Sequence, residues 1–443
     1  MKYIIHSVRI INEGRSFEGS VLVDHGKIQG VYAAGLQAPL PEVANDAETL
    51  DATGCLLLPG VIDTHVHFRD PGFPHKGTWQ SESRAAVAGG VTTVADMPNT
   101  LPQTTTIAAL QEKKAAAAQN SLTNTYCYLG ATADNVDLIA KLTKDDAFAV
   151  KLFMGSSTGN MLLSDDKLLS RLFAECPLPI VAHCESEAII RQNTERYKSL
   201  YGEQIPFAMH PQIRSAEACY TSTEKAVALA QKYGALLHVA HLSTARELQL
   251  FSQSEAKITA ETCPHYLWFC DEDYAEKGAL IKCNPAIKSA DDRAALRRAV
   301  ASGAVASIGS DHAPHTPDEK RRSYLNAPSG LPLIQHSLVS MLELAQQGFF
   351  SAETVVEKMC HAPARIFGIP NRGFIRAGYA ADLVLVRPCA PWQVTNENTL
   401  HKCGWSAFAG QTFSHKVIYT FVNGKIVWRE GESIHSRKSG NGW

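Results

Sequence analysis

The sequence lacks the features of membrane, secreted and nucleic-acid-binding proteins. No run of about 18 apolar residues could span a bilayer. The first eleven residues alternate apolar and polar side chains, unlike the apolar core of a signal peptide. The 443 residues carry a formal net charge of −2, so no basic field is available to hold nucleic acid or an acidic membrane surface. We therefore expect a cytoplasmic protein with no nucleic-acid or membrane partner.

The sequence also lacks a cysteine pattern that predicts disulfide bonds, and it has no low-complexity segment. The eleven cysteines are an odd number, and none forms a C-x-x-C pair, which is typical of reduced thiols in a core. Internal repeats and biased segments are absent. Hydrophobic residues make up 45 % of the chain and charged residues 19 %, which excludes extensive disorder and allows a large buried core.

The middle of the chain alternates short apolar runs with amphipathic stretches. The predicted strands are residues 61–66, 92–97, 124–129, 148–153, 179–183, 236–241, 257–261 and 304–310. Predicted helices in the gaps include 79–89, 165–174, 215–233 and 290–301. Eight strands that alternate with helices predict an α/β fold, a (β/α)8 barrel of the TIM type.

The two ends of the chain have a different, β-rich pattern. Apolar runs at 20–24 and 27–32 flank His25-Gly26, and runs at 417–422 and 425–428 flank Asn423-Gly424. Asn-Gly between apolar runs is a strong hairpin signal. We expect residues 1–57 and 372–443 to pair into one small β-sandwich domain, with residues 58–371 forming the barrel.

The strongest chemical signal is His65-Val66-His67 at the end of the first predicted barrel strand. Side chains repeat every second residue along a strand, so both imidazoles point to the same side. Two imidazoles on one face can bind one metal ion. The alternative is a pair of unrelated histidines on a polar face.

Three further ligand-type residues lie where other predicted strands end. They are His183, His241 and Asp311. Active sites of such barrels lie at the carboxyl ends of the strands, so these side chains are expected to meet His65 and His67. His238, three residues before His241, is expected to face the other way, and His312 to point away from the site.

Lys151, on the fourth predicted strand, is the unusual residue of this set. An ordinary lysine is a cation, with a pKa of about 10.4, and repels metal ions. Carboxylation of its amine by CO2 would instead give an anionic carbamate that can bridge two metals. The residues alone leave open, and indeed favour, a buried lysine paired with an acid.

Together these residues resemble the complete ligand set of the binuclear amidohydrolase superfamily. Its cyclic amidohydrolases share the segments 58–63 and 378–383 as well, so the resemblance covers nearly the whole chain. It implies two Zn²⁺ per chain, held by His65, His67, His183, His241, Asp311 and an N-carboxylated Lys151.

Arg69 narrows the resemblance to the dihydroorotase family. It lies two residues after His67 on the same face of the strand, where a guanidinium can bind a carboxylate in bidentate fashion. The resemblance implies that Asn99 and His315 complete the carboxylate site and that Asn284 recognises the ring amide. It also implies reversible cyclisation of N-carbamoyl-L-aspartate to L-dihydroorotate in pyrimidine biosynthesis, through a metal-bridging hydroxide with Asp311 as general acid and base.

Two kinds of alternative remain at this point. One is an allantoinase or a dihydropyrimidinase (hydantoinase) on the same scaffold, and the other is a non-catalytic scaffold homologue. Homo-oligomer formation stays open. Arg214 is expected either to orient a loop or to form a structural pair with Glu217, and the charged segment 317–326 to be an exposed loop or a lid.

Overall fold

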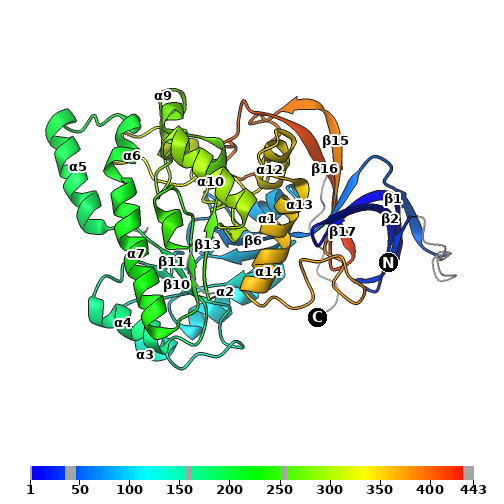
Figure 1. Cartoon of the computed structure of the whole chain (residues 1–443), viewed down its shortest axis with the longest axis horizontal. Helices are drawn as coiled ribbons and strands as arrows, with labels where there is room; N and C mark the ends of the chain where they lie inside the picture. Colours follow the sequence, from blue (N-terminus) through cyan, green and yellow to red (C-terminus); the bar gives the residue numbers. More distant parts are fainter. Residues whose placement is uncertain (1, 35–45, 156–160, 252–256, 433–443) are drawn as a thin grey trace.

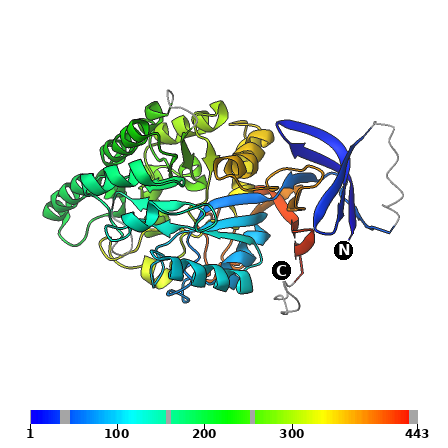
Figure 2. The same cartoon turned by 90° about the horizontal axis from the view of Figure 1, so that it is seen from below.

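The computed structural model describes residues 2–34, 46–155, 161–251 and 257–432 (Figure 1). Residue 1 and the segments 35–45 and 433–443 of the predicted terminal domain lie outside the described residues. The chain has a mixed α/β fold with two parallel sheets and one larger mixed sheet. Figure 2 shows the N-terminal strands at one end of the molecule, with the helix-rich part at the other.

The larger sheet brings together the two ends of the chain. Its order is β17-β16-β15-β5-β1-β2-β3, and β4 pairs with β1. The strands are β1 (Tyr3–Asn12), β2 (Arg15–Asp24), β3 (Lys27–Ala33), β4 (Glu48–Asp51), β5 (Leu56–Pro59), β15 (Leu383–Gln393), β16 (Thr412–Val422) and β17 (Lys425–Arg429). The ends meet where β5 runs antiparallel to β15, with Leu57 opposite Leu385. All eight strands are hydrogen-bonded into one sheet, and the division of the chain into two domains stays a prediction.

Both predicted hairpins are present in this sheet. The β2–β3 turn is His25-Gly26 and the β16–β17 turn is Asn423-Gly424. Asn423 and Gly424 have φ angles of 50° and 71°, the positive values that a tight two-residue hairpin turn requires at both central positions. Asn-Gly therefore determines this connection.

The parallel strands lie in two sheets, with the orders β6-β7-β8 and β14-β13-β12-β11-β10-β9. They are β6 (Val61–Val66), β7 (Val91–Asp96), β8 (Asn124–Cys127), β9 (Leu129–Gly130), β10 (Val150–Phe153), β11 (Ile180–His183), β12 (Leu237–Val239), β13 (Ile258–Thr262) and β14 (Ser307–Ile308). A parallel bridge between Val66 and His312 joins β6 to the segment after β14. Each predicted barrel strand overlaps an observed strand, and the third is divided into β8 and β9.

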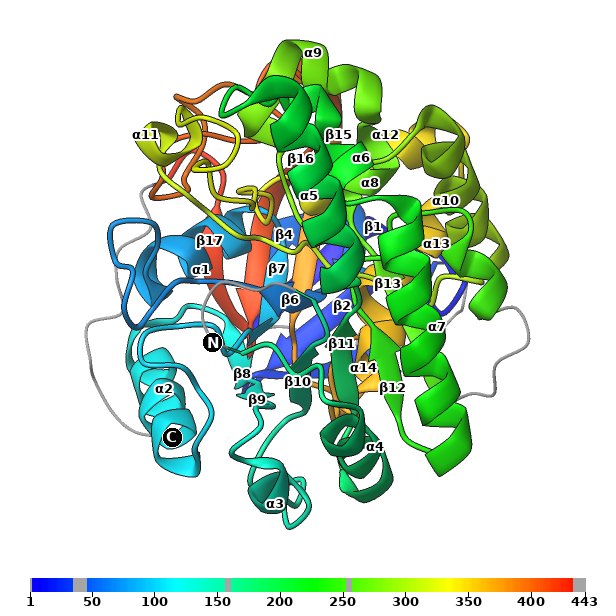
Figure 3. The same ribbon diagram turned by 90° about the vertical axis from the view of Figure 1, so that its left-hand side faces the viewer.

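The helices follow the parallel strands along the chain and, in Figure 3, lie around them. They are α1 (Trp79–Ala88), α2 (Ile107–Asn120), α3 (Val136–Ile139), α4 (Asp166–Glu175), α5 (Glu187–Tyr201), α6 (His210–Ile213), α7 (Ala216–Tyr233), α8 (Pro264–Trp268), α9 (Tyr274–Lys277), α10 (Ala290–Ser302), α11 (Pro317–Lys320), α12 (Ser337–Gln346), α13 (Ala352–Val356) and α14 (Ala362–Ile366). None of the described helices is long and apolar enough to cross a bilayer.

Local sequence explains where several helices begin and end. Thr78 caps α1 and Ser289 caps α10, each with a reciprocal capping box that satisfies free backbone donors. Helix α7 ends at Gly234 in the left-handed conformation that glycine adopts without steric cost. The residues of β6, β7, β10 and β11 are all buried, because helices or other segments cover both faces of these parallel strands.

Candidate metal centre and substrate pocket

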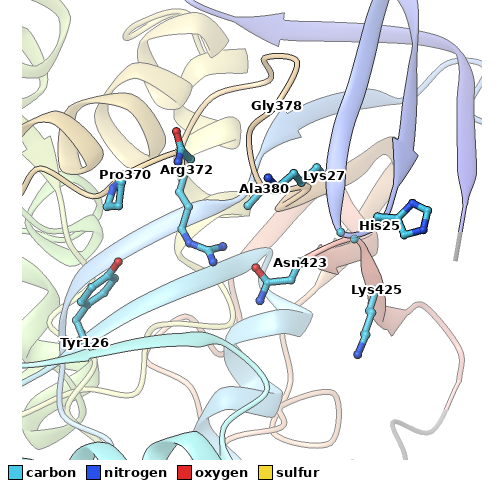
Figure 4. Close-up of a pocket in the computed structure, with 12 residues that line it drawn as sticks. His25, Lys27, Tyr126, Pro370, Arg372, Gly378, Ala380, Asn423 and Lys425 are labelled. Atoms are coloured by element: carbon cyan, nitrogen blue, oxygen red, sulfur yellow. The ribbon is translucent and has the colours of Figure 1, made fainter. Parts of the chain in front are cut away.

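Nine of the ten predicted site residues line one cavity of about 130 Å³ at the carboxyl ends of the parallel strands. They are His65, His67, Arg69, Asn99, Lys151, His183, His241, Asn284 and Asp311. A larger hollow of about 670 Å³, lined by Tyr126, Arg372 and Asn423 among others, lies beside the two hairpin turns (Figure 4). Its described lining includes none of the predicted site residues.

The imidazoles and the carboxylate converge as metal ligands do. The Nε2 atoms of His65 and His67 each lie 3.2 Å from Oδ1 of Asp311. His183 Nδ1 and His241 Nε2 lie 2.8 Å apart. The rings of His65 and His241 are 5.2 Å apart, so the two groups of ligands adjoin. The site therefore has two adjacent clusters of donors.

The backbone turns sharply at three residues of the cavity. Arg69, His241 and Asp311 have φ angles of 67°, 43° and 51°, in the left-handed region that favours glycine. Such conformations cost about 1–3 kcal/mol each and persist where the surrounding structure enforces them. Each of these three residues carries a side chain that lines the cavity, so the strained backbone positions candidate site residues.

Other side chains contact the outer ring nitrogen of three of the four candidate ligand histidines, whereas Nδ1 of His241 has no hydrogen-bond partner in the described residues. His65 Nδ1 contacts Glu261 on β13, and His67 Nδ1 lies 2.7 Å from Asn99 Oδ1. His183 Nε2 lies 3.0 Å from Glu185 Oε2. Such outer partners orient a ligand and raise its basicity.

Two of these supporting residues, Glu261 and Glu185, were not predicted from the sequence. Glu261 lies within a buried strand, where an unexplained carboxylate is itself a signal, and Glu185 lies two residues after His183. Arg214 pairs with Glu185 and not with Glu217, which pairs with Arg246, so the expected Arg214–Glu217 pair is wrong.

The electrostatics favour neutral imidazoles beside ionised carboxylates. Burial lowers the pKa of His67, His183 and His241. Burial alone would raise the pKa of Asp311, but His65, His67 and His241 outweigh it and hold that pKa well below its usual range. Neutral imidazole and ionised carboxylate are the forms that bind metal ions.

Lys151 is fully enclosed, and its amine fits a modified ligand better than a structural ion pair. The residue is 1 % exposed, and Nζ has no hydrogen-bond partner among the described residues. Burial lowers its pKa to about 8, although Glu261 and Asp311 act in the opposite direction. The expected alternative, a lysine paired with an acid, has no ion pair within the described part of the chain to support it.

The other end of the cavity offers donors to an anion. Arg69 Nε donates to Pro314 O at 3.1 Å, and its Nη2 lies 3.1 Å from His315 Nε2. Asn284 lines the cavity, and its Oδ1 is buried without a hydrogen-bond partner in the described residues. His315, 1 % exposed, is outside the cavity lining and lies against Arg69 and Ser329 O. Asn99, predicted to bind substrate, also contacts the ligand His67.

The segment 317–326 begins with helix α11 and is anchored rather than wholly exposed. Lys320 is buried, and Nζ donates to the carbonyl oxygens of Lys282, Pro328 and Gly330 at 3.0–3.1 Å. Lys282 Nζ donates in return to Tyr324 O and Ala327 O, each at 2.6 Å. These lysines fasten the segment to the loop that carries Asn284.

A second buried group consists of Glu82, His312 and His401, which are residue types that can bind a metal ion. The nitrogen of His312 that faces this group is protonated, however, and cannot be a ligand. His312 Nδ1 accepts from the backbone N–H of Leu333 at 3.0 Å, so the proton of its neutral ring is on Nε2. Nε2 then donates to Glu82 Oε2 at 2.9 Å and has no lone pair for a metal. Glu82 and His312 thus form a buried hydrogen-bonded pair with His401 beside it, and His312 points away from the site as expected.

Comparisons with known proteins agree with this geometry. The model of the Amidohydrolase family matches residues 56–427. A dihydroorotase from Halobacterium salinarum is 33 % identical over 423 residues, which are 95 % of this chain and 97 % of that protein. An allantoinase from Streptomyces avermitilis is 32 % identical over 441 residues, 98 % of this chain and 96 % of that one.

A solved structure extends the likeness to the whole fold. The L-hydantoinase (dihydropyrimidinase) from Arthrobacter aurescens superposes with a TM-score of 0.91 at 28 % identity, over 98 % of this chain and 97 % of that one. The similar proteins thus act on different cyclic amides, as their names state. The family model spans most of the chain and the ligand-type residues meet in one cavity, so the chain belongs to the amidohydrolase family.

Proposed function

We propose that this amidohydrolase is a dihydroorotase, which interconverts N-carbamoyl-L-aspartate and L-dihydroorotate plus water. The observation that carries the proposal is the guanidinium of Arg69 at the cavity, across from the histidine and aspartate ligands. Of dihydroorotate, allantoin and dihydrouracil, dihydroorotate alone has a free ring carboxylate that a buried cation would bind. A buried arginine is less easily explained for a neutral ring.

We further infer that the parallel strands form a closed (β/α)8 barrel and that the terminal strands form a separate β domain. The Val66–His312 bridge supports closure on one side, and the immediate succession of β8 and β9 along the chain supports it on the other. In this arrangement all the candidate ligands lie at strand ends, where barrel enzymes place their chemistry.

Two Zn²⁺ ions fit the donors that are present. His65, His67 and Asp311 would hold one and His183 and His241 the other, and a carboxylated Lys151 would add oxygen ligands. The orphaned, buried Nζ of Lys151 supports this assignment. Bound Zn²⁺ supplies Lewis acidity and lowers the pKa of water from 15.7 toward about 7.

The side chains of the chain itself orient the substrate and move its protons. In the direction of ring opening, Asp311 accepts a proton from the attacking water and delivers it to the departing amide nitrogen. In the direction of closure, the same carboxylate accepts a proton from the ureido nitrogen. Arg69 holds the α-carboxylate, which fixes the scissile carbonyl relative to Asp311. Asn284 Oδ1 accepts from a ring N–H.

A spectrophotometric comparison of purified protein on L-dihydroorotate, allantoin and dihydrouracil tests the proposal. We expect turnover of dihydroorotate to exceed that of both neutral rings by orders of magnitude. A preference for allantoin would instead favour the function named for the Streptomyces avermitilis relative. A metal-replete protein inactive on all three would support the scaffold alternative.

A further inference from the structure

His315 touches more groups than a neutral imidazole can satisfy. Its Nδ1 lies 3.0 Å from Lys76 Nζ. Its Nε2 lies 3.1 Å from both Ser329 O and Arg69 Nη2. Burial, together with the nearby charges of Arg69 and Lys76, holds the pKa of His315 well below its usual range, so the ring is neutral with one N–H and one lone pair.

Two tautomers can be compared contact by contact. With the proton on Nε2, the ring donates to Ser329 O and accepts at Nδ1 from the ammonium of Lys76. Only the contact with Arg69 is then unfavourable, because Nη2–H of Arg69 and Nε2–H of His315 are both donors. With the proton on Nδ1, the ring accepts from Arg69, but Nδ1–H meets an ammonium and Nε2 meets a carbonyl oxygen. The first tautomer satisfies two contacts out of three and the second satisfies one.

We propose that Lys76 is a positioning residue that holds His315 in the Nε2–H tautomer, so that this N–H, shared between Ser329 O and a bound ligand, forms with Arg69 a donor pair for an oxyanion. The inference rests on the proposed function and refines it. Two N–H donors 3.1 Å apart repel each other until an acceptor binds in front of both. A substrate carboxylate oxygen removes this repulsion, whereas a neutral ring without a carboxylate leaves it in place.

Glu319 keeps Lys76 in place and explains why the lysine is needed. Its Oε1 lies 2.9 Å from Lys76 Nζ, and its Oε2 accepts from the backbone N–H of Thr316 at 3.0 Å. Glu319 Oε2 is also 3.7 Å from His315 Nδ1. Without the ammonium, this carboxylate becomes the nearest acceptor for an Nδ1 proton and favours the other tautomer.

Long-range proton–nitrogen NMR correlation on the zinc-loaded enzyme tests the tautomer without using activity. The signals of His315 are identified by their loss in His315→Gln. We expect a protonated Nε2 in the wild type and in Lys76→Arg, and a shift toward protonated Nδ1 in Lys76→Met. A wild-type ring protonated on Nδ1, or a Lys76→Met ring identical to the wild type, overturns the proposal.

Kinetics on the same variants test the consequence for binding. Lys76→Met should raise KM for L-dihydroorotate roughly 10- to 150-fold, the effect of losing one hydrogen bond to a charged group, with a smaller change in kcat. Dihydrouracil turnover and the exposed-lysine control Lys27→Met should change little, and Lys76→Arg should recover most of the wild-type KM. If Lys76→Met raised KM but left the tautomer of His315 unchanged, the effect would come from the lost charge of Lys76 alone, which would contradict the proposal. If the wild type turned over no dihydroorotate, the proposed function would fail while the NMR comparison still decided the tautomer.

Discussion

Asn99 Oδ1 lies 2.7 Å from Nδ1 of His67, so an asparagine expected at the substrate also holds a candidate metal ligand. The amide oxygen accepts the Nδ1 proton and leaves the lone pair of Nε2 directed at Asp311. Asn99 thus connects the carboxylate end of the cavity with its metal end.

Asn99→Ala should therefore weaken metal binding as well as substrate binding. Loss of such an outer partner typically costs about 10- to 100-fold in metal affinity. Competition with a chelator measures this affinity directly. Asn284→Ala is the matched control, because Asn284 lines the same cavity and, among the described residues, makes no hydrogen bond to a candidate ligand histidine. Equal metal affinities for Asn99→Ala and the wild type would contradict the role.

Much of the fold and part of the site follow from local sequence. The strands at 61–66 and 180–183 were predictable because short apolar runs end in ligand-type side chains, and the turn at Asn423-Gly424 because both positions need positive φ. The supporting contacts of Glu261, Glu185 and Lys76 were not predictable in this way. The contacts of Glu261 with His65 and of Lys76 with His315 join residues on different strands or loops, and the sequence alone does not contain the distance between them. Glu185 lies close to His183 in the chain, but its second partner, Arg214, is 29 residues away.

Lys151→Ala should abolish activity and release at least one metal ion, since the variant has no amine to carry bridging oxygens. A short carboxylic acid in the buffer should partly restore both by supplying such oxygens. Metal analysis beside the activity assay measures the effect. A variant with wild-type metal content and turnover would show that Lys151 is a structural lysine.

Carboxylation of Lys151 should depend on pH. CO2 reacts with the neutral amine, and burial lowers the pKa of this amine to about 8. In metal-free protein, uptake of labelled bicarbonate should therefore be slow below this pH, where the amine is protonated, and should rise as the pH passes through it. Carbon NMR detects the carbamate, with Lys151→Ala as the blank. A signal that persists in Lys151→Ala, or that does not change with pH, would exclude this account.

Glu82 should stabilise the fold, because it accepts hydrogen bonds from the side chain of His312 and from the backbone N–H of Lys402. Glu82→Ala leaves the Nε2 proton of His312 and the N–H of Lys402 without their buried acceptor. Each buried donor left unsatisfied costs about 1–3 kcal/mol, so we expect a loss of about 2–6 kcal/mol in the free energy of unfolding in urea. Glu82→Gln keeps an acceptor oxygen and should lose less. Glu112 is exposed, so Glu112→Ala serves as the control and should lose little stability. If Glu82→Ala lost as little as this control, the buried group would contribute little to stability.

The measurement that tests the central claim most directly is the ratio of kcat/KM for L-dihydroorotate to that for dihydrouracil, in the wild type and in Arg69→Met. Both substrates have the ring and the scissile amide, and they differ in the carboxylate. If Arg69 binds that carboxylate, its loss should cost on the order of 2–5 kcal/mol for dihydroorotate alone, a fall of about 30- to several-thousand-fold in the ratio. Arg69→Lys should recover only part of it, because an ammonium cannot match both oxygens in one plane. An Arg69→Met variant in which both substrates lose activity equally would contradict the account, because Arg69 would then support the metal site or the fold rather than select the substrate.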